Sequence, residues 1–407
     1  ASSRIARAAA DGPRLAMPRR SGLLRVTSAG LCVGSAGLLV PSMATAEEAR
    51  LSSAWTAVEG TSFLTNFNEK NYAAMRDDTK RTPAFIKAIR QRLAGKEGQA
   101  TFLDIGTGPF ALFALVAARA GAKKVYAIEA NPEAAARARA FVAAQDDIKP
   151  GQVEVIEGFT TAVQVPEKVD YLVGEIIGCI GSEENAIATI RDAQERFMKN
   201  PKDPYAYIPH KIQTFAAPVS YALHPVLAPP RFEKLKGVPL RVNCRDKGVS
   251  LLADPQMIEE FTFDKPPAPG RMQTPAAFTG SFTVDAKRIQ ETEQFLYESL
   301  MKEAEQNKED VKQEEFRKLA KETANSFSGM AMWPKLLLDP AGDVVVDSRG
   351  PLGEPQKSHW QTLLSLMSPV PVPLKAGDVI QVKETAELAR DVTSPVKYTL
   401  DAEIKRA

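Results

Sequence analysis

Two glutamates on one loop are the residues of this chain best suited to do chemistry. Glu175 and Glu184 bracket a glycine-rich segment directly after an apolar, strand-like run that ends at Val173. Two carboxylates held together can accept both arms of a planar cation, which in a protein means a guanidinium. The structural alternative is that Glu183 and Glu184 only begin a helix, whose dipole stabilises acidic side chains at its start.

A second pattern of acids and glycines lies upstream. The apolar run Thr101 to Ile105 is followed by a turn containing Gly106 and Gly108, and Glu129 ends the next apolar run. A carboxylate about 20 residues past such a turn grips the hydroxyls of a ribose in many βαβ units. A glycine turn alone also occurs where it has only a structural role. Asp104 immediately before the turn gives the form Asp-x-Gly-x-Gly, which resembles the S-adenosylmethionine site of class I methyltransferases.

Alternating strands and helices must position these acids. After the strand at 101–105 the apolar periodicity predicts, in order, a helix at 110–120, a strand at 125–128, a helix at 132–145, strands at 153–156 and 169–173, and a helix at 185–198. Ligands of open α/β sheets bind at the carboxyl ends of the strands. We therefore expect Asp104, Glu129, Glu175 and Glu184 to meet at one edge of a Rossmann-like sheet.

The character of the sequence changes near Pro209. Short β-like runs with proline and glycine turns follow, among them 328–338, 343–347, 379–382 and 397–404. We predict an α/β protein with a sheet domain at 47–208, helical from 47 to 100, and a β-barrel-like domain at 209–407. Residues 285–325 form a highly charged helical insertion, read as a solvated hairpin, with a partner-binding arm as the alternative.

Composition narrows the class of protein. The 407 residues carry a net charge of +2 and are 44% hydrophobic, which suits two globular domains and argues against a dedicated nucleic-acid surface. The three cysteines and three histidines do not have the spacing of a disulfide framework or a zinc cluster. We expect no metal site.

Residues 1–46 read as a targeting segment. They are rich in arginine and include the pair Arg19 and Arg20, followed by a small-residue and apolar run at 29–40. That run is too short to span a bilayer, and Ala44 to Ala46 offers a cleavage site. We expect a plastid address first and a cytoplasmic location second, with no membrane span. A disordered basic tail is the alternative.

Four motifs in the right order resemble those of the protein arginine methyltransferases. Met75 to Phe85 is similar to that family's segment of Met, Asp, Arg-Thr and aromatic residues, and Asp104 to Gly108 to its cofactor loop. Glu175 and Glu184 have the separation of its double-glutamate loop. Ser358-His359-Trp360 resembles its Thr-His-Trp loop, which the family places on a β-barrel.

The resemblance implies S-adenosylmethionine as cofactor, arginine side chains of proteins as substrate, and a homodimer. On the cofactor side, Arg81 would pair with the carboxylate and Glu129 would hold the ribose. Asp104, Gly106 and Gly108 would form the cofactor loop, Thr160 and Thr161 would contact the adenine, and Met75 would shape the pocket. On the substrate side, Glu175 and Glu184 would hold the guanidinium. His359 would pair with Asp78 as a proton-handling dyad.

Several positions depart from the family pattern. Phe110 replaces the last glycine of the cofactor loop, Thr161 an adenine-binding acid, and Ala186 a bulky methionine that limits the pocket. Two alternatives follow. One is a non-catalytic scaffold with the methyltransferase fold, binding partners through residues 285–325. The other is a methyltransferase for a small or non-arginine acceptor, admitted by a wider pocket at Ala186.

Overall fold

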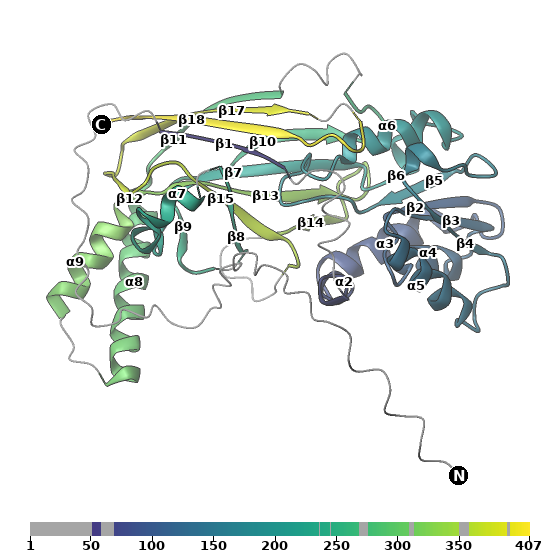
Figure 1. Cartoon of the computed structure of the whole chain (residues 1–407), viewed down its shortest axis with the longest axis horizontal. Helices are drawn as coiled ribbons and strands as arrows, with labels where there is room; N and C mark the ends of the chain where they lie inside the picture. Colours follow the sequence, from purple (N-terminus) through teal and green to yellow (C-terminus); the bar gives the residue numbers. More distant parts are fainter. Residues whose placement is uncertain are drawn as a thin grey trace, which may run out of the picture. The chain divides into compact units, whose positions relative to one another are not determined.

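The computed structural model describes residues 51–57, 69–235, 237–244, 246–267, 276–308, 313–349, 358–388 and 391–407. The targeting segment expected at 1–46 lies outside these ranges. Within them, a parallel sheet covered by helices is followed by a domain of antiparallel sheets (Figure 1). The predicted α/β fold class, with a Rossmann-like sheet before a barrel-like domain, is confirmed.

The parallel sheet has the strand order β4-β3-β2-β5-β6, and each neighbouring pair is parallel. Its strands are β2 (Thr101–Ile105), β3 (Lys124–Glu129), β4 (Val153–Glu157), β5 (Tyr171–Gly174) and β6 (Tyr207–Ile208). The helices of this part are α3 (Arg81–Leu93), α4 (Leu112–Arg119), α5 (Pro132–Ala143) and α6 (Ala186–Arg196). β2 is buried along its whole length, because helices cover both faces of such a sheet.

The turn from β2 into α4 requires its glycines. Gly106 and Gly108 have φ of 74° and 64°, in the left-handed region that side chains disfavour. A Cβ on Gly106 would also come within 2.8 Å of the side chain of Ile176. The backbone can therefore turn tightly at the carboxyl end of β2, where the loops of the sheet gather.

The second domain is antiparallel. One sheet has the order β1-β18-β17-β11, and the other follows β10-β7-β13-β15-β8, with β9 on β7 and β14 on β13. Trp55, Ile380 and Tyr398 of the first sheet share a core with Met332 and Leu363 of the second. The two sheets thus enclose one core, as expected of a barrel-like domain.

The bounds of the antiparallel strands are β1 (Leu51–Thr56), β7 (Lys211–Tyr221), β8 (Leu240–Asn243), β9 (Val249–Leu251), β10 (Gln256–Thr262), β11 (Ala276–Thr283), β13 (Gly329–Leu337), β14 (Val345–Asp347), β15 (Gln361–Leu366), β17 (Val379–Glu387) and β18 (Lys397–Lys405). A separate pair joins β12 (Ser326–Phe327) and β16 (Val372–Pro373). Shorter elements are α2 (Glu69–Arg76), η1 (Thr160–Ala162), η2 (Pro204–Ala206), η3 (His224–Leu227) and α7 (Arg231–Leu235).

The expectation of helix from residue 47 to 100 is wrong at its start. Leu51–Thr56 forms β1, which pairs with β18 in the antiparallel domain, and the first described helix is α2. Leu51 and Trp55 are buried, and the Trp55 ring stacks on Tyr398 at 5.1 Å between centroids. A strand of this length gives little period-two signal, and its partner lies at the far end of the chain.

The charged insertion is a helical hairpin of α8 (Ala286–Asn307) and α9 (Gln313–Ala324), as predicted. Asp285 caps α8, because its side chain accepts hydrogen bonds from the backbone N–H of Lys287 and Arg288. Ile289, Leu296 and Leu300 form its thin buried stripe. No helix among the described residues, α8 included, is long and apolar enough to cross a membrane.

Candidate active site

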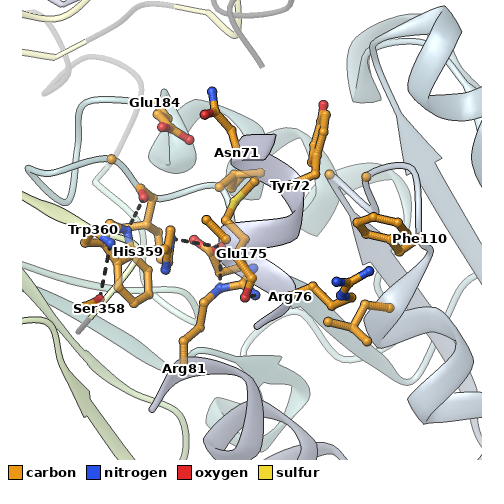
Figure 2. Close-up of a pocket in the computed structure, with 18 of the residues that line it drawn as sticks. Asn71, Tyr72, Arg76, Arg81, Phe110, Glu175, Glu184, Ser358, His359 and Trp360 are labelled. Carbon is orange, nitrogen blue, oxygen red and sulfur yellow. Dashed lines mark hydrogen bonds and ion pairs between the residues drawn. The ribbon is translucent and has the colours of Figure 1, made fainter. Parts of the chain in front are cut away.

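A pocket of about 550 Å³ opens at the carboxyl edge of the parallel sheet, where the antiparallel domain contributes β8 and the segment before β15. Its size is within the range of small-molecule sites. Eight of the residues that the resemblance assigns to the site line it: Met75, Arg81, Gly106, Gly108, Glu129, Glu175, Glu184 and His359. Figure 2 shows several of them together with residues that the sequence did not indicate.

Glu129 ends β3 facing the glycine turn. Its carboxylate accepts hydrogen bonds from the backbone N–H of Gly108, at 2.8 Å, and of Asn131, at 2.9 Å. Burial raises the pKa of this carboxyl although those N–H groups oppose the shift. The turn and the acid thus form one unit, with the carboxylate fixed at the pocket wall.

Asp104 does not line the pocket. It is 1% exposed and accepts hydrogen bonds from Thr107 Oγ1 at 2.6 Å and from the backbone N–H of Ala114 at 3.0 Å. Burial raises its pKa to about 7. Asp104 therefore ties the glycine turn to α4, beneath the surface that a ligand would contact.

Thr160 and Thr161 lie in η1, after β4, and neither lines the pocket. The Thr160 side chain is buried, and its hydroxyl has no hydrogen-bond partner among the described residues. Thr161 is exposed. Their contact with an adenine stays a prediction.

Arg81 pairs with Glu175 at the wall of the pocket. Its Nε donates to Glu175 Oε2 at 2.7 Å, and its Nη2 donates to the same oxygen. Both side chains are more than nine-tenths buried. Arg81 Nη1 also donates to the carbonyl of Met75, at 3.2 Å, and the guanidinium lies over the Phe113 ring. Arg81 therefore fixes the orientation of Glu175 as well as bringing a charge to the pocket.

Glu184 lines the pocket just before α6, where it is largely but not fully removed from solvent. Burial, together with the nearby charges of Glu175 and Glu183, raises its pKa to about 8. Two carboxylates that repel each other in this way favour a cation between them. This electrostatic arrangement suits a guanidinium.

Glu183 has a partner that the sequence did not indicate. It pairs with the Arg241 guanidinium of β8 and accepts a hydrogen bond from the backbone N–H of Cys179 at 3.0 Å. Arg241 Nη1 also lies 3.0 Å from Cys179 Sγ. The structural alternative, in which Glu183 and Glu184 only begin a helix, does not describe Glu183. Its carboxylate anchors the loop to the second domain.

His359 lines the pocket, and Asp78 lies behind it. His359 Nδ1 is 2.9 Å from Asp78 Oδ2, and the backbone N–H of His359 donates to the same oxygen at 2.7 Å. Burial alone would raise the pKa of Asp78. Hydrogen bonds from His359 and from the backbone N–H groups of Arg81 and Lys80 instead hold it well below its usual range.

An ionised Asp78 has a consequence for the imidazole. It places the proton of a neutral His359 on Nδ1 and leaves the lone pair on Nε2, which lies 4.0 Å from Glu175 Oε2. Trp360 Nε1 donates to the carbonyl of Ile177 at 2.8 Å, which ties this segment to the glutamate loop. The dyad is therefore aimed at the side of the pocket that holds the glutamates.

Of the positions that depart from the family pattern, Phe110 lines the pocket and Ala186 does not. Phe110 lines the pocket, and the Arg76 guanidinium lies 4.8 Å from the centre of its ring. Ala186 is completely buried and does not line the pocket. The wider pocket expected at Ala186 is therefore not present, because the first turn of α6 points into the core.

Some pocket residues were missed. Tyr72 lies one helical turn before Met75 on α2, so the i, i+3 spacing could have revealed it. Arg241, Asn243 and Gln361 come from β8 and β15, far along the chain. Their sequence surroundings carry no local signal of a site.

These elements make up a Rossmann-like sheet domain joined to an antiparallel domain. Protein arginine methyltransferase 10 of Arabidopsis thaliana, solved in an open conformation, has this fold, with a TM-score of 0.61 at 20% identity over 85% of this chain and 95% of that one. A Trypanosoma brucei PRMT1 enzyme-prozyme complex with AdoHcy matches with a TM-score of 0.53 at 17% identity, over 77% of this chain and 87% of that one.

Curated proteins with similar sequences are named arginine methyltransferases. Protein arginine N-methyltransferase PRMT10 of Arabidopsis thaliana is 39% identical over 127 residues, 31% of each chain. The arginine N(omega)-methyltransferase of Streptomyces achromogenes is 36% identical over 132 residues, 31% of this chain and 34% of that one. The chain thus spans about a third of the length of these relatives. No protein-family profile matches it. Over that matched third, the chain is similar to proteins named arginine N-methyltransferases, the family that its motifs resemble.

Proposed function

We propose that this protein transfers a methyl group from S-adenosylmethionine to a guanidinium nitrogen of arginine side chains in protein substrates. The observation that carries the proposal is the joint placement of Glu175 and Glu184 in one pocket with the glycine turn and Glu129. Relatives named arginine methyltransferases support it.

The residues of the pocket fit such a cofactor. Gly106 and Gly108 line the pocket in left-handed conformations and carry no side chain, so their backbone is exposed to a ligand in the pocket. Glu129 is fixed at the end of β3, where it would hold the ribose hydroxyls. Arg81 and Met75 would border the other end. When bound, the cofactor supplies a methyl group on a positively charged sulfur.

The glutamates would solve an electrostatic problem. Two unit charges about 4 Å apart repel by roughly 4 kcal/mol at an effective dielectric of about 20, so a sulfonium and a guanidinium resist each other's approach. Glu175 and Glu184 would offset that repulsion. They would also align the attacking nitrogen with the methyl group, and such positioning supplies much of the acceleration in transfer reactions.

A proton must also leave the guanidinium as the carbon–nitrogen bond forms. His359 Nε2 is directed toward Glu175, and Asp78 holds the tautomer that leaves this nitrogen free to accept. We assign the final proton acceptance to this dyad. Glu184 acts with Glu175 in holding the cation rather than in removing the proton.

The test is transfer of labelled methyl from S-adenosylmethionine to an arginine-rich peptide by the full chain. Glu175→Gln and Glu184→Gln should each lower transfer by about 100-fold or more, because each removes one of the two anions. Glu195→Gln, an exposed acid on α6, is the matched control and should leave transfer unchanged. Full transfer by Glu184→Gln would contradict the double-glutamate mechanism.

A further inference from the structure

The loop between the two glutamates is held from outside, by side chains of the antiparallel domain. Ser182 Oγ donates to Glu259 Oε1 at 2.6 Å, and Thr214 Oγ1 donates to Glu259 Oε2 at 2.8 Å. The backbone N–H of Gly181 donates to Thr214 Oγ1 at 2.8 Å. Tyr398 places its hydroxyl 2.8 Å from Ser182 Oγ. Both carboxylate oxygens of Glu259 thus accept hydrogen bonds from hydroxyls that lie at, or bind to, the tip of the loop.

The direction of each bond follows from the proton count. Ser182 has one hydroxyl proton, which it donates in the hydrogen bond to Glu259. The Tyr398 hydroxyl must therefore donate to Ser182. The Thr214 hydroxyl accepts a hydrogen bond from the loop backbone and donates its own hydrogen bond to Glu259. Two chains of hydrogen bonds therefore end on Glu259, and such chains strengthen one another in a buried setting. Without Glu259, the buried hydroxyls of Ser182 and Thr214 lose the acceptor of their own protons.

A β-bulge aims Glu259 at the loop. The register of β10 against β7 shifts between Met257 and Glu259, so that Glu259 stands opposite the buried Thr214. With an unbroken register it would stand opposite Gln213, whose amide instead bonds to the exposed Glu260. Bulges re-aim side chains near functional sites. The extra residue thus turns this carboxylate inward.

Packing alone does not account for a carboxylate at this position. Glu259 is 4% exposed, and burial raises its pKa. A second acid, Glu384, is 2% exposed nearby, and its Oε2 has no hydrogen-bond partner among the described residues. Buried carboxyls are costly, and apolar residues of similar volume often stabilise a core better. The buried Glu259 is therefore better explained by its orientation of the loop than by a contribution to the stability of the core.

We propose that Glu259 is a positioning residue that, through Ser182 and Thr214, holds the loop of Glu175 and Glu184 in the geometry that binds a guanidinium. The proposal rests on the proposed arginine methylation. It makes the antiparallel domain part of the acceptor site without any contact between Glu259 and the substrate.

The experiment compares Glu259→Ala and Ser182→Ala in the full chain with Glu260→Ala, the adjacent outward acid that pairs with Lys211 and Gln213. Both inward variants should lower kcat for an arginine-rich peptide by about 10- to 100-fold, since small misplacements are that costly in transfer reactions. Affinity for S-adenosylmethionine should stay within about two-fold of the parent, because its pocket wall is untouched. Glu260→Ala should match the parent in both.

A thermodynamic cycle sharpens the result. Ser182→Ala with Glu259→Ala should be no worse than the poorer single variant, because both break the same bond. Ser182→Ala removes one hydroxyl, so it tests the bond even where Glu259→Ala fails to fold. Full kcat in Ser182→Ala would overturn the proposal, as would an equal loss of cofactor binding and turnover, which is the mark of a purely structural residue.

Hydrogen exchange of residues 175–184 separates this proposal from the proposed function. The Gly181 amide is bonded to Thr214 and should exchange faster in both inward variants, whether or not the parent methylates arginine. Unchanged protection would contradict the positioning role even in an active enzyme. If the variants lose protection but the parent itself transfers no methyl group, the proposed activity is refuted and the positioning role is not.

Discussion

If Glu184 holds the guanidinium as proposed, the binding of an arginine peptide should depend on pH. Its pKa is raised to about 8, so the Glu184 carboxyl is mostly protonated at neutral pH when no substrate is bound. Binding of a guanidinium must therefore be accompanied by loss of that proton. The affinity for an arginine peptide should therefore rise by about ten-fold per pH unit below about 8 and level off above it. Calorimetric titrations from pH 6 to 9 measure this.

Glu184→Gln provides the control for that dependence. A glutamine cannot titrate, so the peptide affinity of this variant should be weak and nearly independent of pH over the same range.

The raised pKa of Glu184 should also make the stability of the fold depend on pH. The folded state holds a proton that the unfolded state has lost, so this group's contribution to stability falls as pH rises from the ordinary glutamate pKa toward about 8. Equal pH dependence in the variant and the parent would assign the effect to another group.

At the scale of the element, strand β8 is fastened to the glutamate loop by one ion pair. Arg241→Met would leave Glu183 buried without its cation. The expected loss of unfolding free energy is about 2 kcal/mol, less than the 3–5 kcal/mol of fully buried pairs because Arg241 is 38% exposed. Urea denaturation measures it.

The double variant completes that prediction. Arg241→Met with Glu183→Gln removes both charges and should recover most of the lost stability, because no uncompensated charge remains. Recovery would show that the pair matters for charge balance. A double variant less stable than either single one would mean that the two side chains contribute independently.

How far the sequence predicts an element depends on how local its determinants are. The β2-turn-α4-β3 unit follows from apolar runs and glycines within one stretch, and the structure agrees closely with it. His359 and Asp78 were paired only through a family motif. Arg241 and Glu259 reach the loop through long-range strand register and a bulge, which no local pattern encodes. Ala186 was misjudged because which side of α6 faces the pocket was not visible in the sequence.

At the scale of the whole molecule, we propose a homodimer, on the resemblance to a family whose members usually dimerise. The solved Trypanosoma brucei relative is described as a heterotetramer. Light scattering of the purified chain at micromolar concentration should give twice the 44.2 kDa of one chain. A mass of one chain across the concentration range at which methyl transfer is measured would exclude the dimer as a requirement for activity.

The pairing of β1 with β18 governs the order in which the chain can fold during synthesis. Leu51 lies opposite Ala402, so β1 can pair only after β18, far along the chain, has left the ribosome. The parallel sheet uses only residues 101–208 and can assemble long before. The nascent protein can therefore hold a complete parallel sheet while β1, made before that sheet, still lacks its partner β18.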